Sequence, residues 1–137
     1  MTTESDRGEL SPDEQFANAY CHFVEALKVL AEDADAQCVL MGNYNVAWEI
    51  KHDVSAGFWL LNLPSELTQR ERDGIAGIVT ALDQIPPPVL EGDTTAAGNQ
   101  RAMHHPCWVP LRARAAALLT LLSGATSRNE AFFRKKT

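Results

Sequence analysis

The sequence has no long hydrophobic run. Its longest uninterrupted apolar stretch, Ala56 to Leu61, contains a glycine. That stretch is far shorter than the roughly 20 residues that span a bilayer. The first twenty residues hold five carboxylates and no apolar block, the opposite of a secretory signal peptide. We therefore expect a cytoplasmic protein that does not associate with a membrane.

Cysteine is also scarce: Cys21, Cys38 and Cys107 are odd in number and widely spaced along 137 residues. This pattern favours reduced thiols over a disulfide framework. The length and the hydrophobic fraction of 45% predict a single compact domain. We divide the chain into a flexible leader (residues 1–10), a helical domain (11–125) and a short basic C-terminal helix or tail (126–137).

The usual enzyme motifs are missing. No phosphate-binding G-x-x-x-x-G-K-[ST], nucleophile G-x-S-x-G or zinc-binding H-E-x-x-H occurs. The densest group of potential metal ligands is His104, His105 and Cys107, but no second ligand pair accompanies it to complete a zinc site. We expect these residues to position Trp108, and we expect no metal, no cofactor and no enzymatic activity. The alternative is a small metal-dependent or cofactor-free enzyme that uses them beside residues 89–103.

Two segments carry strong helix-start signals. Ser11-Pro12-Asp13-Glu14 and Thr68-Gln69-Arg70-Glu71 both match a capping box. Apolar residues recur at helical spacing after the first of them, at Phe16, Tyr20, Phe23, Leu27 and Leu30. We expect that helix to end near Glu32, Asp33 and Asp35, because carboxylates oppose the negative end of a helix dipole. Replacing these three by lysine should therefore leave stability unchanged or slightly higher.

The second half of the chain predicts two more helices and one loop. The capping box at Thr68 opens a helix that should reach about Gln84. The prolines at 86–88 then predict an exposed loop from Val89 to Gln100. A further helix should open near Trp108 and stop at Gly124 in a left-handed conformation. A last short helix could start at Ser127.

Residues 36–63 allow two interpretations. Tyr44, Val46, Trp48 and Ile50 alternate with less apolar residues, which suits a hairpin within residues 44–63. Helical spacing instead places one apolar face at Val46, Ile50, Val54, Phe58 and Leu61. No Asn-Gly or similar turn pair closes a hairpin here, so we favour helices. The predicted fold is mainly α, and the alternative is α+β with that hairpin.

The charge is unevenly distributed. Residues 1–100 carry 17 acidic against 5 basic side chains, whereas residues 101–137 carry 1 against 7. An anionic body repels phosphate backbones, so we expect no direct nucleic-acid partner and favour a basic macromolecule. Two alternatives stay open: acidity that serves only solubility, and an adaptor that docks through its basic end, Arg134-Lys135-Lys136.

Two stretches resemble a known class of proteins: Gly42-Asn43-Tyr44-Asn45-Val46-Ala47-Trp48-Glu49 and His105-Pro106-Cys107-Trp108-Val109-Pro110-Leu111-Arg112. They resemble small proteobacterial immunity proteins of contact-dependent growth inhibition systems, over roughly Cys38 to Leu122. The resemblance implies a non-catalytic protein that binds and neutralises a cognate toxin domain, commonly a basic nuclease such as one that cleaves tRNA. It implies no particular binding residue.

The expected toxin-binding residues follow from charge and aromatic character. Tyrosine and tryptophan are frequent interface anchors, and Tyr44 lies in a polar setting between Asn43 and Asn45. Acidic side chains before and after it would cover the active site or the RNA-binding surface of a basic toxin. The predicted set is Glu32, Asp33, Asp35, Tyr44, Glu49 and Asp53.

Overall fold

A computed structural model describes residues 10–42 and 44–136, and these form helices without any strand. The helices are α2 (Pro12–Ala31), α3 (Ala34–Met41), α4 (Val46–Ser55), α5 (Gly57–Leu60), α6 (Gln69–Leu82), α7 (Pro87–Leu90), α8 (Ala96–Met103), α9 (Trp108–Leu121) and α10 (Ser123–Lys136). This confirms the predicted helical domain and rules out the hairpin at residues 44–63. Apart from Leu10, the predicted leader lies outside the described residues.

The two capping boxes form as predicted. The Ser11 hydroxyl accepts from the Glu14 backbone N–H, and the Glu14 carboxylate accepts from the Ser11 backbone N–H. Thr68 and Glu71 make the same pair of bonds at the start of α6. Each box satisfies backbone donors that have no partner inside the helix, which fixes where these two helices begin.

The prediction for the acidic segment after α2 was wrong in one respect. Helix α2 ends at Ala31, close to where we expected, but Asp33 is the N-cap of the next helix, α3. Its Oδ1 accepts from the Ala36 backbone N–H at 2.8 Å, and Asp35 lies in the first turn of α3. Carboxylates are favourable at this positive helix end. Replacement of these residues by lysine is therefore expected to destabilise the protein.

The exposed loop predicted for residues 89–100 was also wrong in part. Two short helices, α7 and α8, occupy most of this stretch. The prolines that were expected only to interrupt structure also form the first turn of α7, where a missing N–H costs nothing. The Thr95 hydroxyl starts α8 by accepting from the Gly98 backbone N–H at 3.0 Å.

The C-terminal helix is longer than predicted. Helix α9 ends at Leu121, and α10 begins at Ser123 without a left-handed stop at Gly124; Gly42 is the one described residue with positive φ. Helix α10 has 14 residues and is tied to α2. The Tyr20 hydroxyl lies 2.8 Å from Thr126 Oγ1, and Asn129 Nδ2 donates to the Ala17 carbonyl at 3.1 Å. The predicted boundary at residue 126 therefore falls inside a helix.

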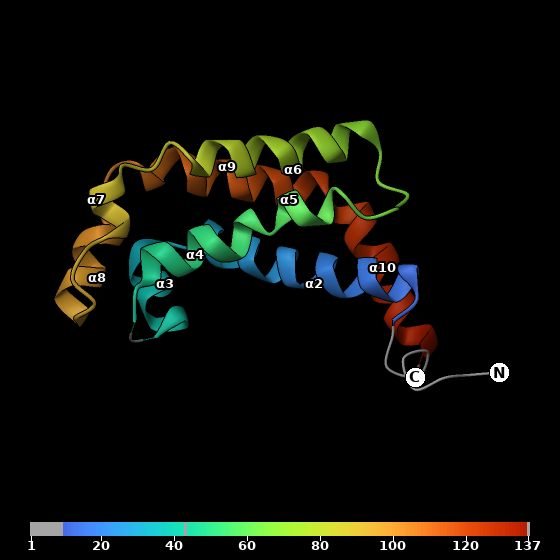
Figure 1. The fold of residues 1–137 in the computed structure, drawn as a ribbon, viewed down its shortest axis with the longest axis horizontal. Helices are drawn as coiled ribbons and strands as arrows, with labels where there is room; N and C mark the ends of the chain where they lie inside the picture. The colour runs from blue at the N-terminus through green and yellow to red at the C-terminus, as the bar shows by residue number, and fades with distance from the viewer. Residues whose placement is uncertain (1–9, 43, 137) are drawn as a thin grey trace.

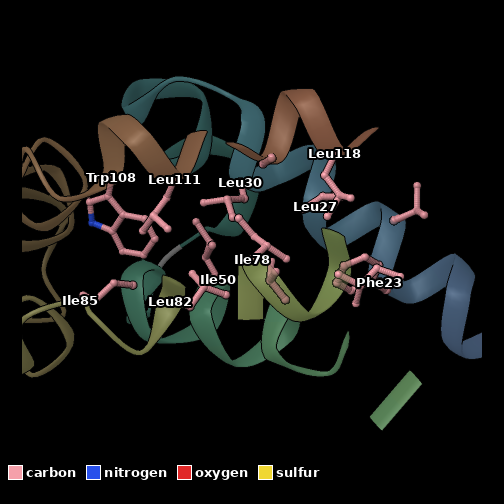
Figure 2. Packing of buried hydrophobic residues seen from close by; sticks show 14 of the residues in the cluster. Phe23, Leu27, Leu30, Ile50, Ile78, Leu82, Ile85, Trp108, Leu111 and Leu118 are labelled. Carbon is pink, nitrogen blue, oxygen red and sulfur yellow. The ribbon is translucent and has the colours of Figure 1, made fainter. Parts of the chain in front are cut away.

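Most of the core lies between α2, α4, α5, α6 and α9. In Figure 1, α2 runs along one side of the molecule, α6 and α9 run along the other, and α4 and α5 lie between them. Figure 2 shows side chains from α2, α4, α6 and α9 pointing toward one another. The fully buried large residues are Tyr20, Phe23, Leu27, Leu30, Ile50, Leu60, Ile75, Ile78, Leu82, Met103, Trp108 and Leu122. Burial of this surface is the main stabilising term for such a domain.

One buried polar network joins four helices near the end of α2. The Gln37 side chain is fully buried, and its Nε2 donates to the carbonyls of Val29 and Leu30 at 3.1 and 3.0 Å. Its Oε1 accepts from Arg112 Nε and Nη2 at 3.2 and 2.9 Å. Arg112 also donates to the Met103 carbonyl. The network adds a donor to carbonyls in the last turn of α2, where helix carbonyls lack the usual intrahelical partner; the Val29 carbonyl also accepts from the Glu32 backbone N–H at 3.1 Å. Within the described ranges, no helix is long and apolar enough to cross a membrane.

Candidate functional site

Large aromatic side chains are exposed along the outer face of α4 and α5. Helix α5 follows α4 after Ala56, whose backbone is helical, so the two elements present one continuous face. Trp48, His52 and Trp59 recur on that face at steps of four and seven residues. Trp48 is 48% exposed and Trp59 is 64% exposed. We call these three residues the aromatic row.

Opposite the aromatic row, the same helices face the core. Val46, Ile50 and Val54 are buried there, as the helical interpretation predicted. Phe58 was expected on this apolar face but is 68% exposed, which corrects that prediction. Gly57 takes its place, because α2 lies too close for a side chain: a Cβ on Gly57 would meet the Phe23 ring at 2.7 Å.

The start of α4 is held by two asparagines. Asn45 Oδ1 accepts from the Trp48 backbone N–H at 3.0 Å, and its Nδ2 donates to the Leu90 carbonyl at 2.7 Å. The buried Asn99 of α8 accepts from the Val46 N–H at 3.1 Å and donates to the Tyr44 carbonyl at 2.6 Å. These bonds fix the backbone of Tyr44 while its side chain remains exposed, as predicted for an anchor.

An open groove lies between α2 and α4. Its volume is about 420 Å³. An apolar floor runs between two polar rims, His22 and Glu25 on α2 and His52 and Asp53 on α4; the floor residues are Ala26, Val29, Met41, Ile50 and Ala56. Among its described lining residues, none is a lysine or an arginine. We call this feature the α2–α4 groove.

The aromatic row and the groove meet at His52. The His52 and Trp48 rings stack with centroids 4.8 Å apart and an interplanar angle of 15°. His52 Nδ1 lies 3.5 Å from Asp53 Oδ1. His52 and Asp53 therefore line one side of the groove, and the Trp48 ring stacks on His52 without lining the groove itself.

The structure divides the predicted toxin-binding residues into two groups. Tyr44, Glu49 and Asp53 lie on or just before α4, beside the aromatic row. Glu32, Asp33 and Asp35 lie at the turn between α2 and α3. The side chains of Asp33 and Asp35 make contacts within the protein. Asp33 caps α3, and Asp35 Oδ1 lies 3.1 Å from His104 Nε2. One group belongs to α4 and the other to the turn before α3, so the six residues do not share one helix face.

Sequence reasoning missed the aromatic row and two rim residues of the groove. Trp48, His52 and Trp59 could have been found in the sequence, because they lie on the helix face opposite the predicted apolar face. His22 and Glu25 belong to the exposed side of α2, and no local pattern marks them. They became candidates only because α4 packs beside α2.

The His104–Cys107 segment shapes the start of α9. The Cys107 backbone N–H donates to His105 Nδ1 at 3.0 Å. Trp108, which follows, is fully buried, and its Nε1 donates to the Ala102 carbonyl at 3.0 Å. Burial raises the pKa of the Cys107 thiol, which disfavours the thiolate that metals bind. In the part of the chain that the structure describes, no three His, Cys, Asp or Glu side chains are placed to share a metal ion.

Comparison with known proteins does not assign a family or a function to this arrangement of residues. No protein family, no curated protein and no solved structure matches the chain.

Proposed function

We propose that this protein is an immunity protein: it binds a basic toxin domain, such as a tRNA-cleaving nuclease, in the cytoplasm and neutralises it stoichiometrically. The observation that carries the proposal is the aromatic row of α4 and α5, exposed beside Glu49 and Asp53. Aromatic side chains next to carboxylates suit a partner whose surface is both apolar and cationic.

The exposed aromatic surface is costly without a partner. A large apolar side chain loses roughly 1.5–3 kcal/mol of favourable transfer free energy when it stays in water instead of being buried. Trp48 is about half exposed, and Phe58 and Trp59 are largely exposed. Trp108, by contrast, is fully buried in the core. Tryptophan and tyrosine are also enriched among residues that dominate binding energy. The outer face of α4 and α5 therefore has the composition of an interface centre.

The charge distribution supplies the second support. Residues 1–100, which include α2 to α7, carry 17 acidic against 5 basic side chains. A nuclease that binds RNA needs a basic surface, and opposite charges raise the rate of encounter between such partners. Carboxylates at Glu49 and Asp53 would then occupy cationic side chains that otherwise hold substrate phosphates, so inhibition needs no catalytic group.

The acidic turn between α2 and α3 has a different role in this proposal. Glu32 and Asp35 are exposed and add to the negative field that steers the toxin. Asp33 is needed to start α3. We therefore place the close contacts at Tyr44, the aromatic row, Glu49 and Asp53, and long-range attraction at Glu32 and Asp35.

Co-expression with a candidate toxin tests the proposal. The toxin is the C-terminal domain of a large exported protein encoded immediately upstream, expressed in cells with and without this chain. We expect growth arrest without the chain and growth with it. A stable one-to-one complex should also appear in size-exclusion chromatography.

Variants locate the contact surface. Trp48→Ala combined with Asp53→Asn should weaken protection and complex formation. Val109→Ser on α9 and Glu130→Gln on α10 are the controls, because one changes an exposed apolar residue and the other an exposed carboxylate on helices away from α4. Absence of a toxin gene beside this one, or full protection by the double variant, would contradict the proposal or its placement on α4.

A further inference from the structure

The α2–α4 groove is lined by carboxylates without a lysine or arginine among its described lining residues, whereas the hollow beside α10 sets Asp13 and Glu66 against Arg128. Its described lining includes two carboxylates, Glu25 and Asp53, and two imidazoles. A hollow beside α8 pairs Asp93 with Arg101, and one between α6 and α9 contains Arg114. The α2–α4 groove is thus suited to a cation.

The nearest cation does not fill the groove. Lys28 Nζ lies 3.4 Å from Glu25 Oε1, but the two side chains are 55% and 65% exposed. Pairs as exposed as this one contribute little to stability. An incoming cation can therefore displace Lys28 from Glu25 at small cost.

The walls of the groove fit a planar cation. A guanidinium group stacks on flat rings and donates two parallel N–H groups to a carboxylate, whereas an ammonium group does neither as well. The His52 ring, backed by Trp48 at 4.8 Å, offers the flat surface. Asp53 lies at the edge of that ring, and Glu25 stands on the opposite rim.

The floor fits the stem of the same side chain. Ala26, Val29, Met41 and Ile50 present carbon atoms along the bottom of the groove. Arginine carries three methylene groups that pack on apolar surface while its head remains with polar partners. An arginine flanked by apolar residues would therefore match both the floor and the rims.

From this combination we infer that the α2–α4 groove binds an arginine side chain of the toxin domain. The guanidinium stacks on His52 and bonds to Asp53 and Glu25. The inference rests on the proposed function for the identity of the partner. It goes beyond that proposal because it names the chemical group that the groove selects.

A tripeptide probe tests this without the toxin. Acetyl-Leu-Arg-Leu-amide is titrated into the full chain labelled with 5-fluorotryptophan, next to versions with lysine or neutral citrulline in the centre. We expect a saturable ¹⁹F shift at Trp48, with the buried Trp108 unmoved. The citrulline peptide should bind about tenfold more weakly, because a lost charge-assisted hydrogen bond changes affinity by at least that factor. The lysine peptide should fall between the two.

Variants of the rims provide the second arm. Glu25→Gln with Asp53→Asn should reduce arginine-peptide affinity at least to the citrulline level, while Glu130→Gln on α10 leaves it unchanged. Circular dichroism checks that each variant folds. Equal affinity for arginine and citrulline peptides, no saturable shift at Trp48, or binding that survives the double variant would overturn the inference.

The outcome also separates this inference from the proposed function. If the peptide binds as expected but the upstream toxin is not neutralised, the proposed function is wrong and the arginine specificity of the groove stands. If the toxin is neutralised equally by the parent and by Glu25→Gln with Asp53→Asn, the toxin does not use the groove and the inference is wrong.

Discussion

Replacing Gln37 by leucine should strongly destabilise the protein. The side chain is fully buried and makes four hydrogen bonds, to Val29, Leu30 and twice to Arg112. Leucine fills a similar volume but leaves two carbonyls at the end of α2 without this donor. It also removes two of the three hydrogen bonds that Arg112 donates within the described residues and leaves the one to the Met103 carbonyl. Burial already lowers the pKa of that half-buried guanidinium.

The expected magnitude follows from these bonds. The two neutral bonds contribute about 1 kcal/mol each, and the bonds to the charged Arg112 contribute about 2 kcal/mol together. Leucine returns about 1 kcal/mol through its more favourable burial. We therefore expect a net loss of about 3 kcal/mol, which lowers the melting temperature by about 10 °C in a domain of this size.

Urea unfolding followed by circular dichroism measures the loss. The partner variant Arg112→Met and the double variant complete a mutant cycle, and we expect the double variant to cost clearly less than the sum of the singles. Glu91→Gln serves as a surface control that should leave stability unchanged. A loss below about 1 kcal/mol for Gln37→Leu, or strict additivity in the cycle, would refute the view that Gln37 and Arg112 act as a unit.

Three further outcomes are expected. Asp33→Ala removes the α3 cap and should lower the free energy of unfolding in urea by about 1 kcal/mol, whereas Asp33→Asn should lower it less. An unfolding free energy of Asp33→Ala equal to that of the parent would contradict a capping role for Asp33. Gly98→Ala should lower the melting temperature, because the new Cβ meets the backbone of the preceding loop, and an unchanged value would contradict that close approach. Iodoacetamide at pH 8 should label the exposed Cys21 first, since burial raises the pKa of Cys38 and Cys107; mass spectrometry of the digest reads the order, and faster labelling of either of these would disprove it.

Helix starts could be predicted from the sequence because capping is local. The hydroxyl of Ser11 and the N–H it caps are three residues apart, and Thr68 repeats the pattern. The buried stripe of α2 followed in the same way from helical periodicity. Such signals decide the fold class, since they need no knowledge of which helices become neighbours.

The same local rules failed where one sequence signal is compatible with two local structures. An acidic cluster can end one helix or begin the next, and Asp33 begins α3 because the chain turns at Glu32. Prolines can stop a helix or open one, and Pro87 opens α7. Gly124, a residue typical of helix ends, lies in the first turn of α10, because a new helix starts directly after α9 ends at Leu121. In each case the rest of the chain selects between two locally acceptable conformations.

The candidate site was decided by tertiary structure. Tyr44 could be predicted as exposed from its polar neighbours and Trp48 from the apolar face opposite it, but only packing against α2 shows that Gly57 and not Phe58 is buried. Glu25 and Asp53 lie far apart in sequence and line one groove because α2 and α4 pack side by side. A groove depends on contacts between distant segments, and periodicity within one segment carries no information about them. The sequence therefore determined the helices and the acidic character, and packing determined where an apolar floor and two carboxylates come together.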